Sequence, residues 1–516
     1  MEIARHDPIG RMHSRIGNFA ERLGRAAERF VAETPEGIIV LVALAAFAVL
    51  WMIFWTVSTA SLDIHIDNDE ALGWAQHFAF GYKHPPMTGW IFILWFSLFP
   101  REKWAVDLLN VMNSAVALGI TWRLLRDHLD KNRALLGLFA LMLIPLYDAK
   151  AEVLNANTVM IPFWAAALLF YLRARRGLGV LDAFLAGAFA SCTMLGKYWA
   201  IFLFAGMAVA SIVGPGTKRF WRSPAPYVMA AAAIVVIAPH IWWSLHNAAG
   251  LQFAQSVINY IPLGETLTKS ALYVLGAIAY IIVPLIFLVA LRPSRAALAD
   301  IVRPAADDRQ QALVLLLVPL ILPALLNLVV PYRVTPDWTF PNWALLPIAL
   351  YGSPRLAIDA SAAAHAGVVA LAMTLAVVIA SPVIAGVRLA YGPDQYRPHF
   401  RQTAELAERL SGGPVPLYWG TDDVTAGLRV YLPGAQLLSA SPFSDPGRPT
   451  GSLHGLVVVC LMIDTRCRNV GDTLAKKGAT TTTAALTRRF LGFTSPPLDL
   501  QITVVPPAET PARTTP

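Results

Sequence analysis

Residues 37–56, with the sequence GIIVLVALAAFAVLWMIFWT, form an apolar stretch without a single charged side chain. A helix needs about 20 mostly apolar residues to cross the hydrocarbon core of a bilayer. The stretch follows 36 other residues and is too long for the apolar part of a cleavable signal peptide. A single buried helix of a soluble core is excluded because similar stretches recur along the chain. The pattern therefore predicts an integral membrane protein with many spans.

The overall composition agrees with a membrane location. Hydrophobic residues make up 56% of the 516 residues and charged residues only 14%, whereas soluble chains average about 25% charged residues. The net charge of +8 does not indicate nucleic-acid binding, because the basic residues lie in short clusters between apolar stretches, as the positive-inside rule describes. We therefore expect the lipid bilayer, and no nucleic acid, as a partner.

Four basic clusters predict the orientation: residues 123–133, 173–176, 218–222 and 292–303. With these clusters and the N-terminus in the cytoplasm, the chain crosses the membrane eleven times and ends on the outer side. The expected spans, which make up a transmembrane domain over 37–390, are 37–57, 104–124, 134–148, 157–173, 180–196, 198–214, 225–245, 271–291, 312–331, 341–353 and 366–387.

Two further segments are predicted to lie along the membrane surface. Within residues 1–36, apolar residues recur at helical spacing between arginines. This indicates an amphipathic helix on the cytoplasmic face or, equally well, a solvated helix. Residues 87–99 (MTGWIFILWFSLF) are too few to cross and are rich in Trp and Phe, so we expect an interfacial helix. It belongs to an expected external loop, 59–103.

The composition changes after about residue 388, where Pro, Gly, Asp and Thr become common. The stretches 416–420 (PLYWG), 455–461 (GLVVVCL) and 498–506 (LDLQITVVP) are typical of short strands, and short helices are expected between them at 425–432 and 472–477. We therefore predict a small extracytoplasmic α/β domain over 391–506 and a disordered tail over 507–516. The fold class is an all-α polytopic membrane domain, with interfacial helices, joined to this domain.

The three cysteines are too few for a disulfide scaffold. Cys192 lies in an apolar stretch and is interpreted as inert core. Cys460 and Cys467 both fall in the C-terminal region, where a strand end and the following loop can bring two α-carbons within bridging distance. They are either a disulfide in an oxidising compartment or two unrelated small apolar residues.

The segment 64–90 (IHIDNDEALGWAQHFAFGYKHPPMTGW) is rich in ionisable residues close to an expected external span end. Asp69 and Glu70 lie here, and carboxylates near lipid are rare without a function because they are costly to desolvate. The chain looks helical from Ala71, which places Asp69 at a helix start. The structural alternative is that Asp69 is only an N-cap.

Other polar residues at expected external span ends can converge on the same outward cavity. They are Lys83, His84, Asn157, Lys197 and Arg333. Lys197 has a structural alternative as a lysine that reaches from a span end to the membrane interface. No HExxH or CxxC motif occurs, so no cofactor is assigned, and a divalent metal is not supported by the pattern of ligand residues.

These motifs resemble those of the GT-C glycosyltransferases. Within that group the chain is most similar to the family 39-like branch, with protein O-mannosyltransferases, the lipid A aminoarabinose transferase and rhizobial galacturonic acid transferases. The matching residues, between about 60 and 350, are Asp69-Glu70, His84-Pro85-Pro86, Asn155 to Thr158, Gly196-Lys197-Tyr198, and Pro239-His240 through Trp243. At Asn157 many relatives have an acid, and at Lys83 some have a metal-binding glutamate, so metal dependence is not carried over.

The resemblance implies a hexosyl- or pentosyltransferase of the bacterial inner membrane that works with inversion on the periplasmic face. The N-terminus would then be cytoplasmic and the 391–506 domain periplasmic. A polyprenyl-phosphate-linked sugar would be the donor, and an envelope glycolipid such as lipid A or core oligosaccharide the acceptor. Asp69 would be the catalytic base with Glu70 in support, and the five residues named above would bind the donor phosphate or substrate. The competing interpretation is a transporter or lipid flippase, which typically shows repeated halves and polar groups near the bilayer midplane. The sequence shows neither feature.

Overall fold

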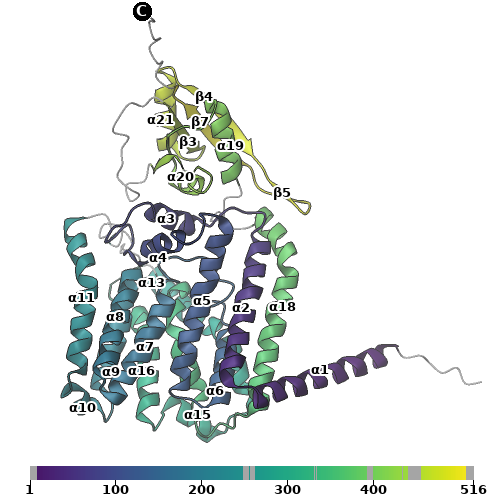
Figure 1. Cartoon of the computed structure of the whole chain (residues 1–516), viewed down its shortest axis with the longest axis vertical. Helices are drawn as coiled ribbons and strands as arrows, with labels where there is room; N and C mark the ends of the chain where they lie inside the picture. The colour runs from purple at the N-terminus through teal and green to yellow at the C-terminus, as the bar shows by residue number, and fades with distance from the viewer. Residues whose placement is uncertain are drawn as a thin grey trace, which may run out of the picture.

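In the computed structural model of this chain, the described residues are 8–247, 255, 262–330, 332, 334–391, 399–432, 434–439 and 455–506. A bundle of helices carries a smaller sheet domain on one of its ends (Figure 1). This arrangement confirms a helical bundle followed by a C-terminal α/β domain. The predicted tail, 507–516, lies outside the described residues.

The bundle contains long helices, short helices and two 3₁₀ segments. In chain order they are α1 (Pro8–Glu33), α2 (Glu36–Ser58), α3 (Ile66–Trp74), α4 (Met87–Phe96), α5 (Lys103–Arg126), α6 (Lys131–Leu141), α7 (Met160–Gly177), α8 (Val180–Gly196), η1 (Tyr198–Ala200), α9 (Ile201–Ile212), α10 (Thr217–Trp221), α11 (Ala225–His246), α13 (Leu263–Tyr280), α14 (Ile282–Ala290), α15 (Arg295–Val302), α16 (Asp307–Asn327), η2 (Pro336–Leu345), α17 (Leu346–Tyr351) and α18 (Ala360–Tyr391).

Within the described residues, five helices are long and apolar enough to cross a membrane: α2, α5, α11, α16 and α18. The pair α13 and α14, bent by 49°, makes a sixth if it is counted as one broken span. The chain is thus a multi-pass membrane protein, and the predicted number of eleven spans is not confirmed.

Two predicted spans are wrong as continuous membrane-crossing helices. In 134–148, helix α6 ends at Leu141 and the chain continues in turns. In 341–353, the segment divides into 3₁₀ helix η2 and the six-residue α17. Pro341 lies inside η2 and Pro347 near the start of α17. Since proline has no backbone N–H and its ring clashes with the preceding turn, a regular span does not form there.

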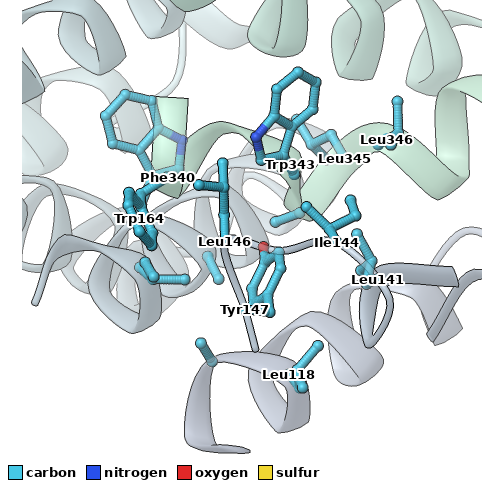
Figure 2. Packing of buried hydrophobic residues seen from close by; sticks show 14 of the residues in the cluster. Leu118, Leu141, Ile144, Leu146, Tyr147, Trp164, Phe340, Trp343, Leu345 and Leu346 are labelled. Carbon is cyan, nitrogen blue, oxygen red and sulfur yellow. The ribbon is translucent and has the colours of Figure 1, made fainter. Parts of the chain in front are cut away.

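These two irregular segments pack against each other in the core of the bundle. Figure 2 shows Ile144, Leu146 and Tyr147, from the turns after α6, next to Phe340 and Trp343 of η2. All five side chains are buried. Non-helical backbone at membrane depth is tolerated only where protein surrounds it, and this packing meets that condition.

The basic clusters lie together at one end of the bundle. Arg173 Nε is 2.5 Å from an Asp127 oxygen, so the first two clusters lie side by side. Arg176 Nη2 is 2.5 Å from Asp308 Oδ2, at the start of α16. Arg126 pairs with Glu36 at the start of α2. The short helices α10 and α15, from the other two clusters, lie at the same end, opposite the sheet domain (Figure 1). We call the two ends the basic end and the domain end.

The two segments expected along the membrane surface are both helical, and neither is among the five helices that can cross a membrane. Helix α1 is amphipathic and projects sideways from the basic end (Figure 1). Helix α4 has ten residues and lies with α3 near the domain end (Figure 1). Both observations agree with the predicted secondary structure.

The C-terminal domain is a five-stranded mixed sheet with the strand order β2-β1-β3-β7-β4. Strands β1 and β3 pair in parallel, as do β1 and β2, whereas β7 is antiparallel to β3 and β4. Its elements are α19 (Phe400–Ser411), β1 (Leu417–Gly420), α20 (Asp422–Leu428), β2 (Gln436–Ser439), β3 (Leu456–Leu461), α21 (Thr465–Ala475), β4 (Thr480–Leu486), β5 (Arg489–Phe490), β6 (Phe493–Thr494) and β7 (Leu498–Val504).

The three predicted strands correspond to β1, β3 and β7. Strand β4 was not anticipated because its sequence, TTTTAAL, is not apolar, and its side chains are partly or fully exposed. Cys460 at the end of β3 and Cys467 in α21 form a disulfide with a Cα–Cα distance of 5.5 Å. The bridge is therefore present, and Cys192 is the free cysteine.

The domain is joined to the bundle through Asp63, a buried residue in the loop between α2 and α3. Asp63 Oδ2 accepts a hydrogen bond of 2.7 Å from the Phe400 amide, and Asp63 Oδ1 accepts one from the Tyr431 hydroxyl. Burial raises the pKa of Asp63, although these two hydrogen bonds oppose the shift. Arg488 adds a third contact by donating to the Ala60 carbonyl at 3.3 Å.

Replacing Asp63 by alanine is expected to loosen this junction. A hydrogen bond to a charged group contributes about 1.5–3 kcal/mol, so the Phe400 amide should exchange its hydrogen about tenfold faster or more. Hydrogen–deuterium exchange with peptide-resolved mass spectrometry measures this rate. Asp359→Ala is a matched control, because Asp359 caps α18 at the basic end. Unchanged exchange at Phe400 in Asp63→Ala would show that the junction depends on other contacts.

Candidate active site

A cavity of about 930 Å³ lies at the domain end of the bundle. Among the described residues, its polar wall carries nine acidic, basic or histidine side chains: His65, Asp67, Lys83, His84, Lys150, Glu152, Lys197, Asp337 and Arg388. Its apolar wall is built from α16 and from the shorter apolar helix α9, which contribute Ile201, Phe202 and Leu326. One cavity thus brings charged groups next to apolar surface.

Helix α3 positions the acidic residues of the segment 64–90. The helix begins at Ile66 and its N-cap is His65, whose Nδ1 accepts from the Asp67 amide at 3.1 Å. The interpretation of Asp69 as a cap is therefore wrong, because the helix starts earlier than Ala71 and Asp69 lies within its first turns.

The two aspartates of α3 have different surroundings. Asp67 lines the cavity, and its Oδ2 accepts from Asn155 Nδ2 at 2.9 Å. The Asp69 side chain is 0% exposed and does not belong to the cavity wall. Glu70 is also outside the wall, and its Oε1 forms an ion pair of 2.7 Å with Lys83 Nζ. The cavity thus presents Asp67, and not the expected pair Asp69-Glu70.

The turn before α7 forms a second part of the wall. Asn155 Oδ1 accepts from the amides of Asn157 and Thr158, which closes the turn. Asn157 Oδ1 in turn accepts from Lys197 Nζ at 2.7 Å. Lys197 Nζ also lies 4.1 Å from the centre of the Trp338 ring, a cation–π contact. These contacts hold Lys197 in the cavity wall.

Further charged residues of the wall are paired across elements that are distant in sequence. Lys150 Nζ is 2.7 Å from Asp337 Oδ1, and Arg388 Nη2 is 2.6 Å from Glu152 Oε1. Arg388 was not anticipated, because a single arginine in the last turn of a long apolar helix resembles an ordinary end-of-span residue. The pairing connects α18 to the turn before α7.

The protonation of His84 in the cavity wall is strongly perturbed. Burial, with the nearby charges of Lys197 and Lys83, lowers the pKa of His84 from 6.5 to about 3. The ring is therefore neutral at neutral pH. It can accept or donate one hydrogen bond without adding charge, and a bound anion would favour its protonation.

One expected site residue cannot be placed: Arg333 lies outside the described residues. Lys83, His84, Asn157 and Lys197 all line the cavity, so four of the seven expected residues converge there. Across the described ranges, no group of three or more His, Cys, Asp and Glu residues is arranged to hold a metal ion.

Comparisons with known proteins agree with the resemblance to GT-C glycosyltransferases. A family model described as dolichyl-phosphate-mannose-protein mannosyltransferase matches residues 83–243. Lipid A galacturonosyltransferase RgtD of Rhizobium johnstonii is 26% identical over 289 residues, which are 55% of this chain and 58% of that protein. The match thus spans little more than half of the length of this relative.

Solved structures of ArnT from Cupriavidus metallidurans share the fold. The structure bound to undecaprenyl phosphate has a TM-score of 0.60 at 13% identity and covers 91% of this chain and 98% of ArnT. The apo structure gives a TM-score of 0.61 with the same identity and coverage. The likeness extends over nearly the whole of both chains, and with the sequence matches it confirms the similarity to GT-C glycosyltransferases.

The lowered pKa of His84 predicts that this ring stays neutral when the pH falls below 6.5. A histidine with a depressed pKa in the folded state resists protonation there, so the fold loses stability as the pH falls from 6.5 towards 3. Nitrogen-15 NMR of imidazole-labelled protein should show a neutral ring for His84 at about pH 5. The signal is assigned by its loss in His84→Gln. A titration centred near 6.5 would contradict the inferred environment.

Proposed function

We propose that the chain is a membrane glycosyltransferase that moves a sugar from a polyprenyl-phosphate donor to an envelope glycolipid, such as lipid A or core oligosaccharide. The observation that carries this proposal is the composition of the cavity. A polar wall with carboxylates and cations meets an apolar wall built from α9 and α16. A lipid-linked sugar needs both, because its tail stays in hydrocarbon while its head must reach polar groups.

The relatives support the two substrate classes. RgtD is named as a lipid A galacturonosyltransferase, and ArnT was solved with undecaprenyl phosphate bound. By analogy, a lipid-linked donor and a glycolipid acceptor suit this chain. The competing transporter interpretation is less well supported, because the paired charges of the cavity lie at the domain end of the spans and not midway along them.

The proposed reaction is an inverting displacement. A hydroxyl oxygen of the acceptor forms a bond to the anomeric carbon of the donor, and the bond from that carbon to the phosphate oxygen breaks. A carboxylate takes the hydroxyl proton, and the polyprenyl phosphate leaves with the electron pair of the broken bond. The site must therefore provide a base on one side and cationic or hydrogen-bonding groups for the phosphate on the other.

The phosphate is assigned to the part of the cavity around Lys197 and His84, with Lys83 and Asn157 nearby. Lys197 is fixed by Asn157 and Trp338, so little side-chain freedom is lost when it binds an anion. A charge-assisted hydrogen bond from a lysine to phosphate is stronger than one between neutral groups. Arg333, which the sequence also assigns to the phosphate, keeps this role as part of the proposal.

The base is assigned to α3, which offers two candidates. Asp69 is the residue that the family resemblance implies, with Glu70 in support. The partial exposure of Asp67 in the cavity favours Asp67, because a general base must reach within hydrogen-bonding distance of the proton it takes. Asp69 is buried and would need a movement of α3 to do so. We therefore propose Asp67 as the base and Asp69 as a residue that maintains α3.

The variants Asp67→Asn and Asp69→Asn test this assignment, since each removes a base while keeping the side-chain shape. Asp67→Asn is expected to lower transfer about 100-fold or more, in line with general-base contributions, and Asp69→Asn to lower it less. Transfer is measured by mass spectrometry of envelope glycolipids from cells with each variant, after expression has been matched. Cells without the protein give the background.

Each possible result of this comparison leads to a different conclusion. The reverse order of the two losses would return the role of base to Asp69. Full activity in both variants would remove the base from α3 altogether. No difference in glycolipids between cells with and without the wild-type protein would contradict the transferase proposal for these acceptors.

The proposed location is the bacterial inner membrane, with the domain end in the periplasm. The gathering of the basic clusters at the opposite end supports this orientation. A phosphatase that is active only in the periplasm should be active when fused after residue 506. The same reporter inserted after Arg222, at the basic end, should be inactive. Exchanged activities would place the site on the cytoplasmic face.

A further inference from the structure

Strands β5 and β6 form a hairpin that is separate from the main sheet of the C-terminal domain. The hairpin extends from the domain towards the end of α18 (Figure 1). Its turn consists of Leu491 and Gly492, with φ angles of +47° and +82°. Positive φ at both central residues is the pattern of the tight hairpin turns that favour Asn-Gly or Asp-Gly.

Leu491 is an unusual residue for this turn. A leucine with positive φ is strained, because its Cβ crowds the backbone in the left-handed region. The side chain is also 63% exposed, so it does not recover this cost by packing within the protein. A single exposed leucine needs no explanation, but one held in a strained conformation at the tip of a hairpin points to a contact outside the protein.

The hairpin packs on a membrane-spanning helix. The ring of Phe493 lies against Gly386 of α18, where any Cβ would overlap it. Gly386 is five residues before the end of α18 at Tyr391, which is about 7.5 Å along the helix. The hairpin therefore packs against the last turns of a membrane-spanning helix, outside the sheet domain to which it belongs.

The exposed side chains around the contact between Phe493 and Gly386 also suit a membrane interface. On α18, Val383 and Val387 are 63% and 46% exposed, so the helix surface close to this contact is apolar. On the hairpin, the exposed Arg489 precedes the tip. An apolar tip with an adjacent arginine fits the membrane interface, where the leucine enters the acyl boundary and the guanidinium meets lipid phosphate.

We propose that the β5–β6 hairpin is a membrane anchor, which inserts Leu491 among the phospholipids of the leaflet on the domain side. The partner is the phospholipid surface itself, recognised by an apolar tip and by the pairing of Arg489 with phosphate. The anchor holds the C-terminal domain to the bilayer at a point separate from its junction at Asp63. It does not depend on the reaction catalysed in the cavity.

Site-directed spin labelling of the full chain in liposomes of phosphatidylethanolamine and phosphatidylglycerol tests the anchor. The label is placed at Leu491→Cys in a Cys192→Ala background, without reductant, so that the disulfide stays closed. Collisions with oxygen, which concentrates in lipid, are compared with collisions with a water-soluble nickel complex. Val383→Cys provides the lipid reference. Thr480→Cys, exposed at the start of β4 in the main sheet, provides the water reference.

The label at 491 is expected to collide with oxygen in preference to nickel, with a ratio close to that at 383. A ratio like that at 480 would overturn the proposal. Because the label itself is apolar, a second probe at Thr494→Cys is compared with and without Leu491→Asn. Asparagine suits the turn, so the hairpin should stay folded, and the probe at 494 should shift towards nickel accessibility. Equal accessibility in the two proteins would show that the leucine does not anchor the hairpin.

Discussion

The cost of placing charge in hydrocarbon is the constraint on which the rest of this structure depends. It moves the ionisable side chains to the two ends of the bundle. At the basic end they pair between helix ends, as Arg173 of α7 does with Asp127 at the end of α5. At the domain end they surround a cavity that remains connected to the apolar surfaces of α9 and α16. The arrangement of the site is thus a consequence of the spans, and the proposed chemistry uses the boundary between the two environments.

The same constraint explains why the cavity wall is nearly balanced in charge. Lys150 and Arg388 are each paired with an acid, Asp337 and Glu152 respectively. Such pairs lower the cost of keeping charges in partly buried positions. They also fix the turn before α7 to η2 and to α18, so that residues far apart in sequence keep a common geometry. The neutral His84 adds a polar group to this wall without adding a charge.

The sequence predicted much of this architecture, because an apolar stretch of about 20 residues is stable as a helix across the hydrocarbon core of a bilayer. Helices α2, α5 and α18 were evident from composition, as were strands β1, β3 and β7. Segments 134–148 and 341–353 were misread, since their apolar composition reflects burial in protein and not contact with lipid. Lys83, His84, Asn157 and Lys197 were found from three separate segments of the sequence. Arg388 required the fold, which brings it to Glu152 across 236 positions. The start of α3 was missed because a histidine, His65, is its cap.

The length of helix α18 and the residues near its end have a mechanical consequence for the site. It is continuous over 32 residues, about 48 Å, and packs against α1 at the basic end. Near its other end it carries both Gly386 under the hairpin and Arg388 in the cavity wall. Spanning helices respond to the thickness of the bilayer by changing their tilt. A change in tilt of α18 would move the guanidinium of Arg388 relative to Glu152, so the thickness of the surrounding lipid becomes a variable in the geometry of the site.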